Sequence, residues 1–249
     1  FRYPGAEEDV LHDISFTAEP GKTTAFIGST GCGKSTLVNL IPRFYDVTDG
    51  KITIDGKDIR NVSQHELREK LGYVPQKAVL FSGDIASNIL YGNPDGSEAE
   101  MTEAATIAQA TEFIEQKKKK YKSTISQGGS NVSGGQKQRL SIARAIAKHP
   151  DVYIFDDSFS ALDYKTDATL RAKLKEKTSE STVMIVAQRI STILHADQII
   201  VLDDGQIVGK GTHKELLKNC EAYYQIASSQ LSEKELEEDL KEVESYAKR

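Results

Sequence analysis

Short, nearly continuous apolar runs recur along this chain, each about as long as a β-strand. The clearest are Ala25–Ile27, Asp151–Asp157, which is apolar from Val152 to Phe155 and ends in two acids, and Val183–Ala187. Strands buried on both faces have this composition, and they are typical of parallel sheets covered by helices. The pattern therefore predicts an α/β fold with a mostly parallel sheet.

The first part of the chain has a different pattern, in which apolar and polar residues alternate. Phe1–Gly5 and Val10–Phe16 predict strands ahead of the turn Glu19–Lys22, and Gly50–Gly56 predicts another strand with a tight turn. Leu71–Gln76 predicts a strand that ends at Gln76. We therefore expect an N-terminal antiparallel β subdomain beside the parallel core.

Helical signals dominate the middle of the chain. Ser97 and Glu100 form a capping box, and apolar residues follow at helical spacing up to Ala108. The lysine run 117–120 is interpreted as solvated surface. A second capping box, Ser133–Gln136, predicts a helix that Pro150 ends, with an N-terminus suited to an anion.

These signals divide the chain into parts of one domain, residues 1–249. We expect an α/β core at 1–76 and 151–228, with an inserted α-helical subdomain at 77–150. Residues 229–249 predict a C-terminal amphipathic helix that starts at Ser232. Its apolar stripe consists of Leu236, Leu240, Val243 and Ala247.

Composition and net charge limit the classes of function that the chain can have. The formal net charge of −5 argues against a nucleic-acid partner. No apolar run approaches the 20 or so residues of a membrane span. The two cysteines are too few for a disulfide framework and favour a reducing cytosol. Because the chain opens on Phe1 in a strand-like segment, we expect a domain cut from a longer protein.

The organising motif lies between the apolar run Ala25–Ile27 and a helical segment that Pro42 ends. It fits the phosphate-loop pattern G-x-x-x-x-G-K-[ST]. Loop amides and a lysine at this spacing hold phosphate, and the serine after the lysine can ligate Mg²⁺. The candidate residues are Gly28, Ser29, Thr30, Gly31, Cys32, Gly33, Lys34, Ser35 and Thr36.

Polar residues end two of the predicted core strands. Asp156 and Asp157 follow the apolar run at 151–155, and Gln188 follows Val183–Ala187. Because open α/β sheets bind ligands at the carboxyl ends of their strands, Asp156 is a candidate for holding Mg²⁺ and Asp157 for facing a γ-phosphate. Helix capping is the alternative role for these acids. Tyr3 is a candidate for stacking on adenine, or else a core or edge tyrosine.

Asn131–Gln136 resembles the signature motif of ABC ATPases, usually written L-S-G-G-Q, with Ser133, Gly134, Gly135 and Gln136 as matching residues. Together with the phosphate loop, this motif indicates that the resemblance to ABC ATPases covers Phe1 to about Ala227. Phe81–Ile85 and Asn88–Gly92 look like the exporter branch of that family. The resemblance implies a P-loop NTPase fold, ATP and Mg²⁺ as ligands, and ATPase activity.

The resemblance also assigns roles to single residues. Tyr3 matches the adenine-stacking aromatic, Gln76 the Q-loop glutamine and Asp156 the Mg²⁺-binding acid, so Ser35, Gln76 and Asp156 become the implied metal ligands. The D-loop matches Ser160, Ala161, Leu162 and Asp163. In such exporters a six-helix membrane domain precedes the nucleotide domain, which lies at the cytoplasmic face of the membrane.

Two positions depart from the family pattern. The residue after the Mg²⁺ acid is normally Glu, which activates the attacking water, and here it is Asp157. The switch-loop residue is normally His, and here it is Gln188. Asp retracts the carboxylate by about 1.5 Å, and misplacement of about 1 Å can cost on the order of 10²-fold in rate. Gln cannot carry charge as imidazole can.

The chain thus resembles the degenerate half of a heterodimeric exporter, in which two ATP molecules lie between one chain's phosphate loop and the other's signature. Its catalytic candidates are Asp157, Gln188 and Gln76. Tolerated drift at the two positions is the alternative. A regulatory, nucleotide-dependent binding module with negligible hydrolysis is the second functional hypothesis. A chromosome-type ABC ATPase is the third, disfavoured because no long coiled coil interrupts the chain.

Overall fold

The computed structural model describes the backbone of residues 1–246 and the side chains of residues 1–240. Its contacts divide the chain into two compact units. The first unit joins Phe1–Arg68 to the segment that starts at Thr182, and the second unit is Glu69–Ser181. The predicted subdivision at residues 76, 150 and 228 stays a prediction.

A parallel sheet forms the core of the first unit. Strand β1 (Thr23–Gly28) lies between β8 (Thr182–Val186) and β9 (Gln198–Asp203) and runs parallel to both, and β10 (Gln206–Gly211) adds an antiparallel edge to β9. Every residue of β8 is buried, as the continuous apolar run predicts. Helix α1 (Lys34–Leu40) packs on β1 and β8. The predicted strand–loop–helix unit is confirmed.

The strands predicted within the first 22 residues are absent. Asp13 adopts a left-handed φ of 49°, and the neighbouring His12 amide donates to the Gly205 carbonyl at 2.8 Å, so this stretch does not pair as a ladder. The alternation still has a structural meaning. Phe16 is half-buried with its ring 5.4 Å from that of Phe26, while Thr17 is exposed. The period of two therefore reports one-sided burial of an extended segment.

The strand predicted at Gly50–Gly56 is also much shorter than expected. Only β2 (Thr53–Ile54) and β3 (Lys57–Asp58) pair, as a two-residue antiparallel hairpin. Asp55 and Gly56 between them have φ values of 52° and 76°, which is the tight turn that the sequence predicts. This hairpin is the antiparallel β element of the N-terminal region.

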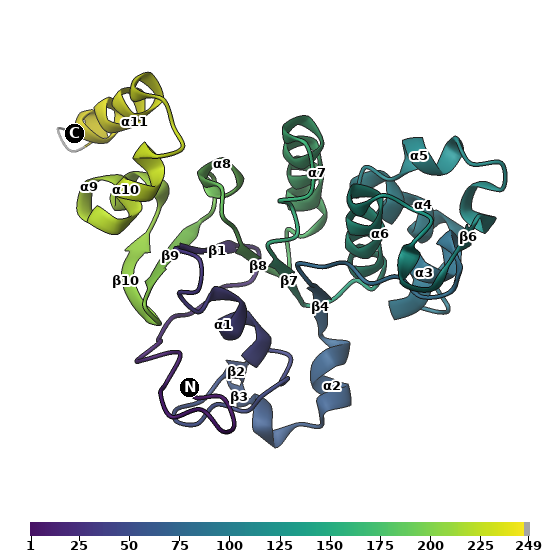
Figure 1. Cartoon of the computed structure of the whole chain (residues 1–249), viewed down its shortest axis with the longest axis horizontal. Helices are drawn as coiled ribbons and strands as arrows, with labels where there is room; N and C mark the ends of the chain where they lie inside the picture. The colour runs from purple at the N-terminus through teal and green to yellow at the C-terminus, as the bar shows by residue number, and fades with distance from the viewer. Residues whose placement is uncertain (247–249) are drawn as a thin grey trace. The chain divides into compact units, whose positions relative to one another are not determined.

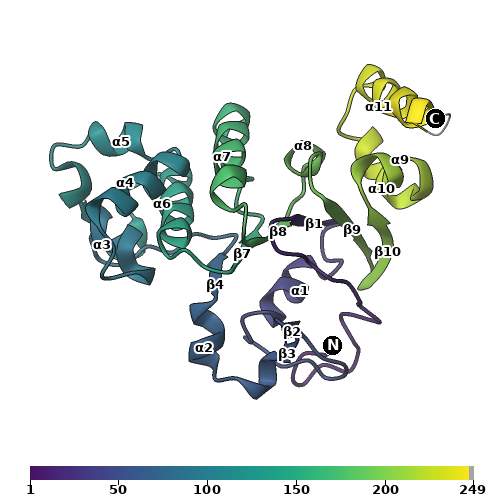
Figure 2. The same cartoon turned by 180° about the vertical axis from the view of Figure 1, so that it is seen from behind.

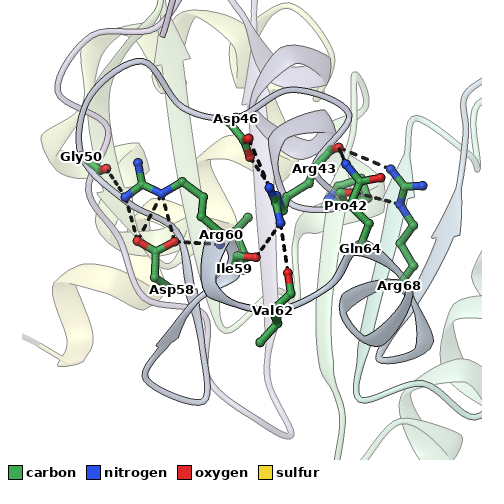
Figure 3. A network of polar contacts seen from close by, with 10 residues as sticks. All are labelled: Pro42, Arg43, Asp46, Gly50, Asp58, Ile59, Arg60, Val62, Gln64 and Arg68. Carbon is green, nitrogen blue, oxygen red and sulfur yellow. Dashed lines mark hydrogen bonds and ion pairs between the residues drawn. The ribbon is translucent and has the colours of Figure 1, made fainter.

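Guanidinium groups hold the irregular segment between α1 and α2 (Gln64–Glu69) (Figure 3). Arg43 donates through Nη1 to the carbonyls of Ile59 and Val62, both at 3.1 Å, and through Nε to Asp46 at 2.8 Å. Arg60 pairs in the same way with Asp58, at 2.7 Å. Side-chain donors thus satisfy carbonyls that a regular sheet would pair, which explains why so little strand is needed here.

The second unit combines one parallel strand pair with a group of helices. Strand β4 (Leu71–Val74) runs parallel to β7 (Val152–Asp156), and the two-residue strands β5 (Gly83–Asp84) and β6 (Thr124–Ile125) pair antiparallel. The helices are α3 (Ile85–Ile89), α4 (Glu98–Ile107), α5 (Thr111–Glu115), α6 (Gly134–Ala147) and α7 (Tyr164–Lys177). Helices α3, α4 and α6 pack on one another (Figure 1).

Both predicted capping boxes are present at the starts of these helices. Ser97 accepts from the Glu100 amide and opens α4, and Ser133 accepts from the Gln136 amide and opens α6. Lys148 caps the C-terminus of α6, two residues before Pro150. In the lysine run 117–120, Lys117 is half-buried and the other three are exposed.

The C-terminal helices belong to the first unit (Figure 2). They follow α8 (Ile190–Ile193) and are α9 (His213–Asn219), α10 (Glu221–Ser228) and α11 (Glu233–Tyr246). Helices α9 and α10 pack on β10, and α11 packs on both helices. Leu236 of the predicted stripe is buried and Leu240 half-buried. The side chains of Val243 and Ala247 lie outside the described residues.

Buried His213 ties these helices together, with Nδ1 2.7 Å from the Tyr223 hydroxyl and Nε2 3.2 Å from Asp239 Oδ2. Burial and the Asp239 charge raise the pKa of Tyr223. Among the described residues, no helix has the length and hydropathy needed to cross a bilayer. The remaining short 3₁₀ turns are Ile59–Asn61, Leu90–Gly92, Lys120–Lys122 and Gln127–Gly129.

Candidate functional site

The phosphate loop occupies the turn between β1 and α1 in the first unit. Gly28 ends β1 and Gly33 precedes the first residue of α1, so the motif lies where the sequence predicts it. A Cβ at Gly28 would lie 2.0 Å from the Leu202 carbonyl oxygen and 2.7 Å from Cys32 Sγ. Gly31 and Gly33 have φ values of 86° and 100°, which favour glycine. The chain therefore needs its glycines to make this turn.

Lys34 is folded over the loop that it follows. Its ammonium donates to the carbonyls of Gly28 at 2.8 Å and Ser29 at 2.7 Å, and the side chain is buried. Cys32 Sγ lies 3.5 Å from the same nitrogen. The loop thus holds one positive charge in a fixed place beside backbone amides, which is an arrangement that binds phosphate.

Tyr3 lies against the start of α1. Its hydroxyl is 2.9 Å from Oγ1 of Thr36, which lies in α1 two residues after Lys34. The rings of Phe1 and Tyr45 meet the Tyr3 ring edge-on, with centroids 4.9 and 5.0 Å away. The half-buried ring is therefore fixed beside the phosphate loop, and its stacking on a base stays a prediction.

Tyr3→Ala is expected to weaken ATP binding by about 1–3 kcal/mol, because base–aromatic stacking contributes that much. Tyr3→Phe keeps the ring and should lose much less. Isothermal titration with ATP and with inorganic triphosphate separates the two roles of Tyr3. An equal loss for both ligands would make Tyr3 a structural residue only.

Gln188 follows β8, next to the phosphate-loop strand. The Ala187 amide donates to the Phe26 carbonyl at 3.0 Å, so Gln188 leaves the sheet at the same edge as Gly28. Gln230, after α10, clamps the backbone here. Its Nε2 donates to the Gln188 carbonyl at 2.9 Å and its Oε1 accepts from the Ile190 amide at 2.8 Å. The backbone at Gln188 is thus held by the segment between α10 and α11.

Asp156 and Asp157 lie at the end of β7 in the second unit, and both are buried. Gln76 Nε2 donates to Asp157 Oδ2 at 3.0 Å, so the sequence-predicted Q-loop glutamine and the candidate catalytic acid are in direct contact. The Tyr73 hydroxyl donates to Asp156 Oδ2 at 3.5 Å. Burial and the nearby Asp156 charge raise the pKa of Tyr73, which therefore stays a neutral donor.

The backbone of Asp157 is unusual. Its φ of 46° lies in the left-handed region, which Asp tolerates better than most non-glycine residues. Its carbonyl accepts from the Ser160 hydroxyl at 2.8 Å. The acid is therefore the first residue of the turn that becomes the D-loop.

The signature and the D-loop are neighbours within the second unit. Ser133 and Gly134 are exposed at the start of α6, and a Cβ at Gly135 would lie 3.5 Å from the Ala161 carbonyl oxygen. Asp163 ends the D-loop and caps α7. It accepts from the Thr166 hydroxyl at 2.7 Å and the Thr166 amide at 3.0 Å, and these bonds lower the pKa of Asp163.

Four polar residues of these surroundings were not found from the sequence: Tyr73, Ser158, Gln138 and Gln230. Each bonds to a site residue or its neighbour over more than 40 positions of chain, so no local pattern marks them. Asp157 also has a left-handed backbone conformation, which aspartate permits but which the residue type alone does not predict.

Residues 11–160 match the family model described as ABC transporter. The chain belongs to the ABC transporter family. The matched residues include the phosphate loop, Gln76, the signature and both acids, whereas Tyr3 and Gln188 lie outside them. The resemblance of the sequence to ABC ATPases is confirmed.

Several bacterial proteins are similar to this ABC transporter domain. An uncharacterized ABC transporter ATP-binding protein of Mycobacterium bovis is 51% identical over 92% of the chain. A putative multidrug export ATP-binding/permease protein of Staphylococcus aureus is 44% identical over 92% of the chain. The chain covers 40% of the length of each.

A solved structure of a bacterial Atm1-family ABC exporter with ATP bound also matches. It has a TM-score of 0.90 and 39% identity over 94% of this chain and 41% of that one. The chain is therefore an ABC transporter ATP-binding domain with the α/β, P-loop NTPase fold that the sequence predicts.

Proposed function

We propose that this chain is the ATP-hydrolysing motor domain of an ABC exporter, that its own ATP site turns over slowly, and that its signature serves a partner half. An intact phosphate loop combined with Asp157 and Gln188 at the two catalytic positions carries this proposal. Lys34 is held for phosphate. Asp157 is a short carboxylate that Gln76 already engages.

The oxygen donors of the chain suit Mg²⁺. The ion prefers carboxylate, amide and hydroxyl oxygens, and Asp156 offers a buried carboxylate. Gln76 directs its nitrogen to Asp157, which leaves its amide oxygen as the group that can ligate. Asp156 and Gln76 of the second unit would hold the ion, which supplies charge neutralisation on the β- and γ-phosphates when it is bound. Ser35 stays the metal ligand that the resemblance implies for the phosphate loop.

The partner assignments follow from the share of its relatives' length that the chain covers and from the names of those relatives. Because the chain covers 40% of an ATP-binding/permease relative, we assign the remaining part of the protein to a membrane-spanning domain, with this chain at its cytoplasmic face. A second exporter half, as a heterodimer, supplies the other signature and a competent catalytic site. The neighbouring coding sequence should encode such a half, with Glu and His at the two positions.

A regulatory module that binds nucleotide and hardly hydrolyses it is the second candidate, and the hydrogen bond from Gln76 to Asp157 favours it. The two candidates differ in what the pair does. A motor half supports ATPase and transport by its partner, whereas a regulatory module changes the partner's activity without its own signature being required.

Ser133→Arg should depress the ATPase rate of the pair by at least about tenfold and leave ATP binding to this chain unchanged, because the signature hydroxyl would face the other half's γ-phosphate. Ser97→Arg is the matched control, since Ser97 caps α4 with the same box and is equally exposed. Equal rates for the Ser133 variant and the control would contradict the head-to-tail arrangement.

A further inference from the structure

The segment that ends β4 is bonded residue by residue to the segment that ends β7. Three hydrogen bonds make the connection: Tyr73 hydroxyl to Asp156 Oδ2 at 3.5 Å, Ser158 hydroxyl to Val74 carbonyl at 2.8 Å, and Gln76 Nε2 to Asp157 Oδ2 at 3.0 Å. Within residues 73–76, Pro75 takes part in none of these three bonds. Its carbonyl has a different partner.

The Pro75 carbonyl accepts from Gln138 Nε2 at 3.2 Å. Gln138 is 2% exposed and lies in the second turn of α6, the helix whose N-terminus carries the signature. A buried amide lowers stability unless it is hydrogen-bonded. If this side chain only filled space, an apolar residue would therefore make the fold more stable. The amide instead links the signature helix to the residue before Gln76.

The covalent geometry makes this link stiff. The Pro75 carbonyl and the Gln76 nitrogen belong to one planar peptide unit, and the Pro75 ring fixes its φ. A displacement of α6 that carries the carbonyl with it therefore carries the Gln76 backbone by a similar amount. The Gln76 side chain then moves relative to Asp157, whose carbonyl accepts a hydrogen bond from the Ser160 hydroxyl.

We propose that Gln138 is a positioning residue, which passes the position of the signature helix to Gln76 and through it to Asp157. The inference rests on the proposed function, since it gives the two ATP sites of a pair a direct connection through one chain. Nucleotide at the partner's site, in contact with the signature, would change how Gln76 engages Asp157 at this chain's own site. All the groups involved lie within the second unit.

A double-mutant cycle in the complete transporter tests this proposal, with the catalytic Glu of the partner half removed so that the steady-state rate reports this chain's own site. Gln138→Met has nearly the same shape without the amide donor, and Gln76→Ala removes the group through which Gln138 is proposed to act. Steady-state kcat and KM for MgATP are measured for the parent, both single variants and the double variant. Gln225→Met, an exposed helical site, is the matched control.

Gln138→Met is expected to lower kcat by about 5- to 50-fold with less than a twofold change in KM, and to lower it no further once Gln76 is Ala. The same fold loss in both backgrounds, or a loss no larger than that of the control, overturns the proposal. Hydrogen exchange of residues 73–80 provides a readout that needs no hydrolysis. Faster exchange in Gln138→Met than in Gln225→Met is expected, and equal exchange overturns the relay even if MgATP hydrolysis is absent.

Failure of the proposed function would give a different experimental result. A transporter whose MgATP hydrolysis is the same with and without Lys34→Ala does not use this phosphate loop. The exchange comparison still decides for or against Gln138 in that case.

Discussion

The double substitution Asp157→Glu with Gln188→His is expected to raise the ATPase rate of the pair by about 10²-fold when the partner's own catalytic Glu has been removed. A positioned general base contributes about 10²–10⁴-fold, and the longer side chain restores the reach that Asp157 lacks. With the partner's catalytic Glu removed, the rate reports this chain's site alone. Coupled-enzyme detection of phosphate release measures it.

Asp157→Asn with Gln188→His is the matched control, because it supplies the imidazole without a carboxylate. It should give no rescue. The left-handed φ of Asp157 works against full recovery, since Glu tolerates that region less well than Asp. If the Glu and His variant binds ATP but stays as slow as the control, Asp157 and Gln188 are not what slows this site.

Lys34→Ala is expected to weaken MgATP binding by about 30- to 1,000-fold, since removal of one partner of a buried, hydrogen-bonded charge pair costs about 2–4 kcal/mol. Lys51→Ala removes an exposed lysine from the same unit and should change the affinity less than twofold. Equilibrium titration with a fluorescent ATP analogue gives both values.

The thermal midpoint of the Lys34 variant is a necessary companion measurement. Its ammonium holds the carbonyls of Gly28 and Ser29, so its loss also loosens the loop. A variant that melts with the parent but binds ATP as tightly would remove the basis for assigning phosphate to this loop.

Elements with a local chemical signal could be predicted from the sequence. The glycines and apolar run around Lys34 predicted β1, the loop and α1, and the boxes at Ser97 and Ser133 predicted the starts of α4 and α6. A further box, Thr212 with Glu215 at the start of α9, has the same signal and could have been found.

The elements and site residues that could not be predicted from the sequence have physical reasons in common with their surroundings in the fold. Helix α7 buries only Asp167, Leu170 and Leu174 among its 14 residues, so its apolar period is too weak to mark it. The first 22 residues alternate without pairing, because burial on one side imposes the same period as a ladder. Site residues such as Gln138 and Gln230 act through contacts distant in sequence, which only the fold reveals.

We propose that this chain binds ATP at a complete phosphate loop and hydrolyses it slowly. One rapid-quench measurement tests both parts by counting ATP bound and ADP formed on the isolated chain. We expect close to one MgATP bound per chain and a turnover at least about a hundredfold below the ~10 s⁻¹ of an ordinary enzyme. An absence of bound ATP, or conversion to ADP within about 0.1 s as that ordinary rate would give, would contradict it.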